Sequence, residues 1–164
     1  AYYQMHRADL VAGLVAALGD APRRMGSALA RIEPEAETVR LGFSDGSEAD
    51  ADIVIAADGL RSLVRERLCA GAPPVFSGHV AWRALVPGAA LGARASEPAS
   101  INHIGPGQNL VTYPVRGREL VNVVALTRAV GDAEESWNVR ADPGELLALF
   151  AGWTAYVTET IAAI

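Results

Sequence analysis

The sequence contains no lysine, so all 14 of its basic residues are arginines. This absence excludes mechanisms that depend on a lysine amine or ammonium, namely Schiff-base chemistry and the phosphate-binding P-loop. The sequence also has a single cysteine, Cys69, which cannot form a disulfide within the chain. Because apolar neighbours flank Cys69 and no histidine or cation motif accompanies it, we expect a small buried hydrophobe rather than a reactive thiol.

Long apolar runs are also missing from the 164 residues. Charge or glycine interrupts each run well short of the roughly 18 residues that a membrane-spanning helix requires. No basic region followed by an apolar stretch opens the chain, so we expect a soluble, cytoplasmic protein without a membrane partner. The net charge of −5 and the scattered arginines argue against a nucleic-acid partner, which would need clustered positive charge. A small molecule is the expected partner.

The first part of the chain combines helical and strand patterns. Apolar residues recur at helical spacing over residues 6–18, and Gly19 and Pro22 end the pattern, which predicts a helix that faces the core. Residues 29–33 and 38–43 alternate in polarity ahead of a turn at 44–47, which predicts a small β meander. Residues 52–57 form a continuous apolar run, the pattern of a strand covered on both faces in a parallel sheet. A helix is predicted over residues 60–68.

The second part of the chain is rich in strand patterns. Two prolines, Pro73 and Pro74, mark a linker. Strand-like runs follow at 76–86, 99–104, 110–115 and 119–127, and their short connections indicate antiparallel pairing. Asp142, Pro143 and Glu145 predict the start of a further helix. The expected fold class is therefore α/β (α+β).

Asp58 and Gly59 follow the predicted parallel strand directly. Open α/β sheets bind ligands at the carboxyl ends of their strands, and the helix that follows would direct free N–H groups towards a phosphate there. An aspartate repels phosphate, so we expect Asp58 to meet a hydroxyl, a backbone donor or a water. The alternative is that the Asp-Gly pair forms only a turn.

Arg7 lies in the first turn of the opening helix, where a cation opposes the helix dipole by about 0.3–1 kcal/mol. A phosphate at that terminus would compensate, because a guanidinium offers a planar fork of donors. The alternative is a solvated arginine or one that pairs with Asp9. We assign His6 and Asp9 to helix capping.

Several short motifs succeed one another: His6-Arg7-Ala8-Asp9-Leu10, Phe43 to Gly46, Asp58-Gly59 with Ser62 and Arg65, Ser77-Gly78 with Ala81-Trp82-Arg83, Gly105-Pro106-Gly107 with Tyr113-Pro114, Glu119-Leu120-Val121-Asn122, and Ser136-Trp137. In this order they resemble the single-component FAD-dependent aromatic monooxygenases of the salicylate hydroxylase type, within the p-hydroxybenzoate hydroxylase superfamily. The resemblance covers essentially the whole chain, and no single motif carries it.

The resemblance implies a role for several residues. Arg7 is similar to the arginine that contacts the flavin's phosphate and ribityl region. Asp58 and Gly59 resemble the Asp-Gly fingerprint that serves FAD and nicotinamide-nucleotide binding, with Arg65 as its internal support. Tyr113 resembles a residue that borders the aromatic substrate, and its alternative is an ordinary packed strand tyrosine.

Other candidates receive structural assignments, and no catalytic residue is identified. Arg83 could meet a substrate carboxylate, but support of the sheet or of a domain interface is the preferred role. His79 and His103 lack partners at metal-ligand spacing, so we predict no metal.

The resemblance also implies an organisation and a reaction. Residues 1–73 would form a partial FAD-binding domain, doubly wound with a β meander, and residues 74–164 a partial substrate domain with an antiparallel sheet. The family's G-x-G-x-x-G turn is absent from this sequence, and Gly131-Asp132 mimics a later Gly-Asp motif without its context. We therefore expect an internal part of an enzyme that uses FAD and NADH or NADPH, and that hydroxylates a small aromatic substrate through a flavin C4a-hydroperoxide.

Two other functions stay open. One is a non-catalytic remnant that binds no flavin and acts as an interaction module, with homo-oligomers formed through exposed sheet edges. The other is a different flavoprotein of the same fold, such as an epoxidase or a halogenase, because a fold does not determine a reaction.

Overall fold

The computed structural model describes residues 3–69, 71–96, 100–129 and 140–164. The chain forms two compact units. The first unit consists of the residues up to Gly19 together with Ser77–Ile164, and the second of Asp20–Phe76.

The second unit contains the predicted β meander. Strands β1 (Leu29–Pro34), β2 (Val39–Phe43) and β3 (Glu48–Ala51) pair in that order, and each pair is antiparallel. The β2–β3 turn is stabilised by Asp45, whose carboxylate accepts the backbone N–H of Ser47 at 2.9 Å and the hydroxyl of Ser27 at 2.8 Å. Alternating polarity and a turn-forming aspartate are local signals, so this part of the prediction is confirmed.

The predicted parallel strand at residues 52–57 does not form. This segment has no regular secondary structure, and Ile53 and Ile55 are 81% and 88% exposed. A strand exists only where a neighbour pairs with its N–H and C=O groups, and no strand of the described residues pairs with this segment. Both sheets that the described residues form are antiparallel, so this part of the chain does not contain the parallel strand that we expected as part of a doubly wound domain.

Helix α2 (Leu63–Leu68) is shorter than predicted because Ser62 caps it. The Ser62 hydroxyl accepts the backbone N–H of Arg65 at 3.0 Å. No residue of α2 is buried, and Cys69, at its C-terminal end, is exposed. The prediction that Cys69 is buried is therefore wrong, because apolar neighbours in sequence do not bury a thiol at the end of a helix that has no buried residue.

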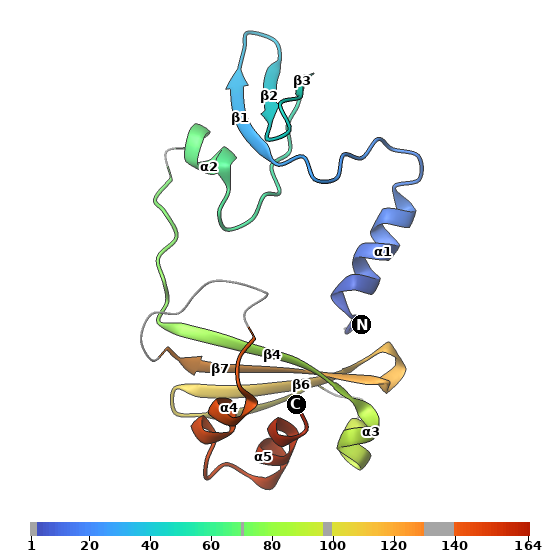
Figure 1. Cartoon of the computed structure of the whole chain (residues 1–164), viewed down its shortest axis with the longest axis vertical. Helices are drawn as coiled ribbons and strands as arrows, with labels where there is room; N and C mark the ends of the chain where they lie inside the picture. Colours follow the sequence, from blue (N-terminus) through green and yellow to red (C-terminus); the bar gives the residue numbers. More distant parts are fainter. Residues whose placement is uncertain (1–2, 70, 97–99, 130–139) are drawn as a thin grey trace. The chain divides into compact units, whose positions relative to one another are not determined.

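The first unit contains a four-stranded antiparallel sheet in the order β4-β7-β6-β5 (Figure 1). Its strands are β4 (His79–Pro87), β5 (Ile101–Gly105), β6 (Gln108–Val115) and β7 (Leu120–Arg128). All four were predicted within a few residues, together with the antiparallel pairing of β6 and β7 across the short connection Arg116–Arg118.

Helices α4 (Pro143–Leu149) and α5 (Ala155–Ala162) cover one face of this sheet (Figure 1). The predicted start of α4 is confirmed, because Asp142 accepts the N–H of Gly144 at 2.8 Å and a proline occupies the first turn. Two short elements between β4 and β5, α3 (Gly88–Leu91) and η1 (Gly92–Ser96), were not predicted. The sheet and these helices share one core, formed by Val86, Leu91, Ala95, Leu110, Val121, Val123, Ala125, Leu146, Phe150, Val157 and Ile161.

Helix α1 (Arg7–Ala17) forms as predicted but does not face a core. None of its residues is buried, and Leu10 and Leu14 are 48% and 59% exposed. The stripe of apolar residues correctly predicts a helix, whereas its burial depends on a covering surface that the described residues do not supply.

Candidate functional site

One face of the four-stranded sheet is opposite to α4 and α5, and we call it the open face. Alternate residues of a strand point to opposite faces, so the neighbours of the core residues Val86, Val121 and Val123 project onto it. Tyr113 lies directly opposite Asn122, and Asn122 directly opposite Leu85. Cβ atoms of such pairs are about 4.5–5.5 Å apart. The three side chains therefore form one continuous row across the open face.

Asn122 is the unusual member of this row. Its amide nitrogen Nδ2 is buried and has no hydrogen-bond partner among the residues that the structure describes. An unpaired buried donor destabilises a protein by about 1–3 kcal/mol. The sequence analysis did not single out Asn122 as a site residue. The signal available in the sequence was a polar residue within the otherwise apolar run of residues 120–126.

Arg83 also belongs to the open face, opposite Val124, and its side chain is exposed. It has an interaction partner within the structure. This geometry does not decide between the two roles considered for Arg83, support of the sheet or a domain interface and contact with a substrate carboxylate.

Arg7 is exposed at the N-terminal end of α1. Asp9 does not cap the helix or pair with Arg7. Instead its two carboxylate oxygens accept hydrogen bonds from Arg116, from Nε at 2.8 Å and from Nη2 at 2.6 Å. These bonds hold the pKa of Asp9 below its usual value. His6 occupies the N-cap position as predicted, but its side chain makes no capping bond, and the capping role assigned to Asp9 is wrong. In the described part of the chain, the Arg7 guanidinium has no ion-pair partner.

Asp58 is tied to the start of α2. Its hydrogen bond with the Ser62 hydroxyl is the main reason that its pKa lies below the usual value, and its carboxylate also accepts the N–H of Val64 at 3.3 Å. Gly59 has a φ of 77°, which favours glycine, and a Cβ there would contact nothing within 4 Å. Arg65 donates to the carbonyl of Leu60 at 2.6 Å and so braces the segment that follows Gly59.

The predicted site residues fall into two groups. Arg7, Tyr113 and Arg83 belong to the first unit, whereas Asp58, Gly59 and Arg65 belong to the second. Within the first unit, the ion pair between Asp9 and Arg116 links the turn of α1 that carries Arg7 to the end of the sheet at which Tyr113 lies.

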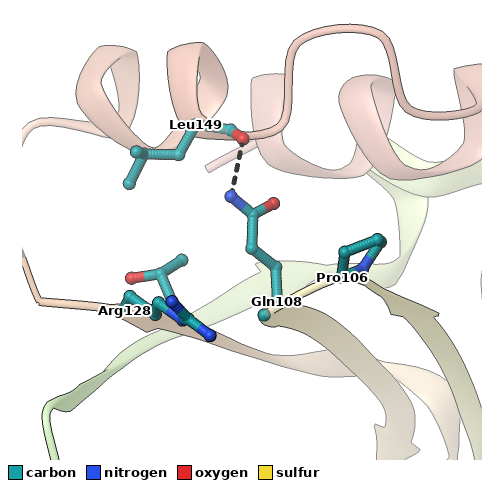
Figure 2. Close-up of a pocket in the computed structure, with 6 residues that line it drawn as sticks. Pro106, Gln108, Arg128 and Leu149 are labelled. Atoms are coloured by element: carbon teal, nitrogen blue, oxygen red, sulfur yellow. Dashed lines mark hydrogen bonds between the residues drawn. The ribbon is translucent and has the colours of Figure 1, made fainter.

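A pocket of about 390 Å³ lies at the other end of the sheet, and Figure 2 shows the residues that line it. There the amide of Gln108 donates to the carbonyl of Leu149 at 3.1 Å, which attaches α4 to the β5–β6 hairpin. Arg128 and the turn residues Pro106 and Gly107 complete the lining together with Thr127. Because its one side-chain amide is already bonded within the fold, we do not take this pocket as the main site.

The two histidines named in the sequence analysis belong neither to the row of Tyr113, Asn122 and Leu85 nor to the residues that line the pocket. His79 contacts the carbonyl of Ser77 at 3.1 Å, and the ring of His103 packs on Tyr156 with centroids 4.7 Å apart. Over the described ranges, no three His, Cys, Asp or Glu side chains gather as a metal site would require. None of the described helices is long and apolar enough to span a membrane.

Comparison with known proteins shows what the whole chain is similar to. No family model matches the chain. A 3-amino-4-hydroxybenzoate 2-monooxygenase of Streptomyces platensis is 35% identical over 99% of this chain and 41% of its own length. The structure of a salicylate hydroxylase substrate complex superposes with a TM-score of 0.72 and 30% identity over 97% of this chain and 43% of that one.

A third similar protein is HpxO of Klebsiella pneumoniae, whose structure was determined with FAD and uric acid. It superposes with a TM-score of 0.78 and 26% identity over 96% of this chain and 40% of that one. The chain thus spans about 40% of the length of the relatives that it matches. Over the part of their length that it spans, the chain belongs to the FAD-dependent aromatic monooxygenases of the salicylate hydroxylase type.

Proposed function

We propose that this chain is the part of an FAD-dependent monooxygenase that presents a small aromatic substrate to the flavin, with NADH or NADPH as the reductant. The observation that carries the proposal is the row of Tyr113 and Asn122 on the open face. A tyrosine ring provides a flat apolar surface, and a buried amide donor beside it requires an acceptor. A phenolate, carboxylate or carbonyl oxygen on an aromatic ring would satisfy both.

The residues assigned to the cofactor have the chemistry that FAD requires. The Arg7 guanidinium is exposed and unpaired among the described residues, at a helix end whose free N–H groups favour an anion, so it suits a phosphate. The ionised carboxylate of Asp58 suits a ribose or ribityl hydroxyl, and Gly59 leaves the backbone open to close approach. When bound, the flavin supplies the oxygen activation and the hydroxyl transfer.

The protein's own contribution in this proposal is placement and shielding. Tyr113 borders the ring of the substrate, and the Asn122 amide donates to one of its oxygen atoms. Leu85 lies at the other end of the row, beside Asn122, and its apolar side chain would help to exclude water from the bound substrate. In this proposal Arg83 supports the sheet and does not contact the substrate.

Flavin binding is tested with the full-length protein encoded by the gene that contains this chain. FAD fluorescence quenching measures the dissociation constant for the wild type and for Arg7→Ala. Loss of a charge-assisted hydrogen bond costs about 1.5–3 kcal/mol, so the dissociation constant should rise roughly 10- to 100-fold. Arg128→Ala, which removes the same charge at the far end of the sheet, is the control and should leave binding unchanged.

Catalysis is tested by NADH and NADPH oxidation in the presence of hydroxybenzoates, with mass spectrometry of the products. A product heavier by one oxygen atom, together with oxidation that depends on the aromatic compound, supports the proposal. A wild-type protein that is colourless and does not respond to added FAD would refute it.

A second candidate function is self-association without flavin. It is favoured by residues 52–57, which pair with no strand of the described residues, and by the exposure of Ile53 and Ile55, since unpaired N–H and C=O groups and exposed apolar side chains promote pairing between copies. Light scattering tests this candidate. Oligomers of the wild type that are lost in the variant Ile53→Asp with Ile55→Asp would support it, and oligomers that persist in the variant would exclude this segment as the contact.

A further inference from the structure

The turn between β6 and β7 has a backbone conformation that two of its three residues disfavour. The φ angles of Arg116, Gly117 and Arg118 are 49°, 62° and 77°. This left-handed region is natural for glycine but unfavourable for arginine. A conformation of this kind persists only where the surrounding structure enforces it.

Backbone contacts with Gly88, the first residue of α3, fix the turn on one side. The backbone N–H of Gly88 donates to the carbonyl of Glu119 at 2.8 Å. A Cβ on Gly88 would lie 2.2 Å from the carbonyl oxygen of Arg118, so only glycine allows the approach. The turn is therefore fixed against the rest of the sheet before any side chain of the turn is considered.

An ion pair with the first turn of α1 is a second contact of the β6–β7 turn. Arg116 donates to both carboxylate oxygens of Asp9, at 2.8 and 2.6 Å, in the bidentate geometry that gives arginine–carboxylate pairs their orientation. None of the residues of α1 is buried. This polar contact, rather than apolar packing, consequently sets where the first turn of α1 lies on the unit.

We infer that Asp9 and Arg116 are positioning residues for the flavin, and the inference rests on the proposed function. Arg7 lies in the same helical turn as Asp9. Tyr113 precedes Arg116 by three residues on β6, at the end of the open face that also carries Asn122. The ion pair thus sets the place of the phosphate-binding guanidinium relative to the substrate row, although neither partner of the pair touches the ligand.

A double-mutant cycle separates positioning from simple charge. If Asp9 and Arg116 acted on an anionic flavin only through their charges, Arg116→Ala would weaken FAD binding and Asp9→Ala would strengthen it. Positioning predicts that each variant weakens FAD binding, by roughly two- to fivefold for a partly exposed pair, and that the double variant is no weaker than either single one.

The matched control is Arg118→Ala. Arg118 belongs to the same turn, also has a positive φ and carries the same charge, but makes no bond to Asp9. The full-length protein carrying Arg118→Ala should bind FAD as the wild type does. Arg116→Lys, which keeps the charge and loses the bidentate fork, should fall between the wild type and Arg116→Ala.

A second measurement does not use the flavin. In the FAD-free protein, the amide of Leu10 donates to the carbonyl of His6 within the first turn of α1. Its hydrogen exchange should accelerate at least twofold in Asp9→Ala and in Arg116→Ala, but not in Arg118→Ala. Unchanged exchange in all three variants would overturn the inference whatever the flavin result.

The outcomes also separate this inference from the proposed function. A wild-type protein that does not bind FAD contradicts the proposed function, and the role in flavin binding falls with it. A wild type that binds FAD, combined with tighter binding by Asp9→Ala or equal effects of Arg116→Ala and Arg118→Ala, overturns the positioning role alone.

Discussion

Replacing Asn122 with leucine should stabilise the protein and, under the proposed function, abolish binding of the aromatic ligand. The amide nitrogen of Asn122 is buried and has no partner among the described residues. Such a donor costs about 1–3 kcal/mol, and a leucine of similar size removes that cost. We expect Asn122→Leu to raise the free energy of unfolding by about 1–2 kcal/mol. For a chain of this length, this corresponds to an increase in Tm of roughly 3–6 °C.

The free energy of unfolding and Tm are measured by urea and thermal unfolding, with tryptophan fluorescence as the signal. Trp82 and Trp153 belong to the first unit, and Trp137 lies outside the described residues, so the signal of the two described tryptophans reports the unit that contains Asn122. Aromatic ligand binding is measured in parallel by the change in NADH or NADPH oxidation. The expected combination is higher stability and an aromatic-dependent rate that is at least tenfold lower.

Asn109→Leu is the matched control for this prediction. Asn109 lies on the same face, but its amide nitrogen donates to the side-chain oxygen of Asn102 at 3.2 Å. Leucine at position 109 breaks an existing bond, so it should leave stability unchanged or lower it. If Asn122→Leu destabilised the protein by 1 kcal/mol or more, the amide would have a partner in the native protein, and the assignment of Asn122 to a ligand would be wrong.

Three further predictions concern stability. Phe150 is fully buried, so Phe150→Ala should cost about 3–5 kcal/mol in urea unfolding, whereas Phe76→Ala, at a side chain that is 58% exposed, should change it by less than about 0.5 kcal/mol. Hydrogen bonds from the hydroxyl and the backbone N–H of Ser47 lower the pKa of Asp45 from 3.8 to about 2. Because the folded-state pKa is depressed, this stabilisation is present above about pH 4 and is lost as the pH falls to about 2; an NMR titration in which Asp45 shows an ordinary pKa would contradict this. A Cβ on Gly105 would lie 2.6 Å from the ring of Trp153, so Gly105→Ala should cost about 1–3 kcal/mol and shift the tryptophan emission; an unchanged spectrum and Tm would show that the ring moves freely.

Local structure was largely predictable because its causes are local. The start of α4 follows from the side chain of Asp142 and the ring of Pro143, and the β2–β3 turn follows from Asp45. Alternating polarity located β6 and β7, since each strand has one face in the core. These signals act between residues that are close in the sequence, so they are readable without knowledge of the partners.

Burial was predicted less well, because it depends on what covers a segment. Three apolar features that we expected to be buried are mostly exposed in the structure: Cys69, the apolar stripe of α1 and the run at 52–57. The composition of a segment describes the environment for which it is suited. Whether that environment is present depends on other segments, and the chain spans about 40% of the length of its relatives.

The sequence by itself determined the family, the order of most elements and the candidate cofactor residues, because motifs and periodicities are properties of neighbouring residues. The tertiary structure alone decided that Asp9 binds Arg116 rather than capping its helix, and that the amide nitrogen of Asn122 is buried without a partner among the described residues. Asp9 and Arg116 are 107 residues apart in the chain, and hydrogen-bond satisfaction at Asn122 depends on three strands at once. Such contacts depend on geometry that only the folded chain creates.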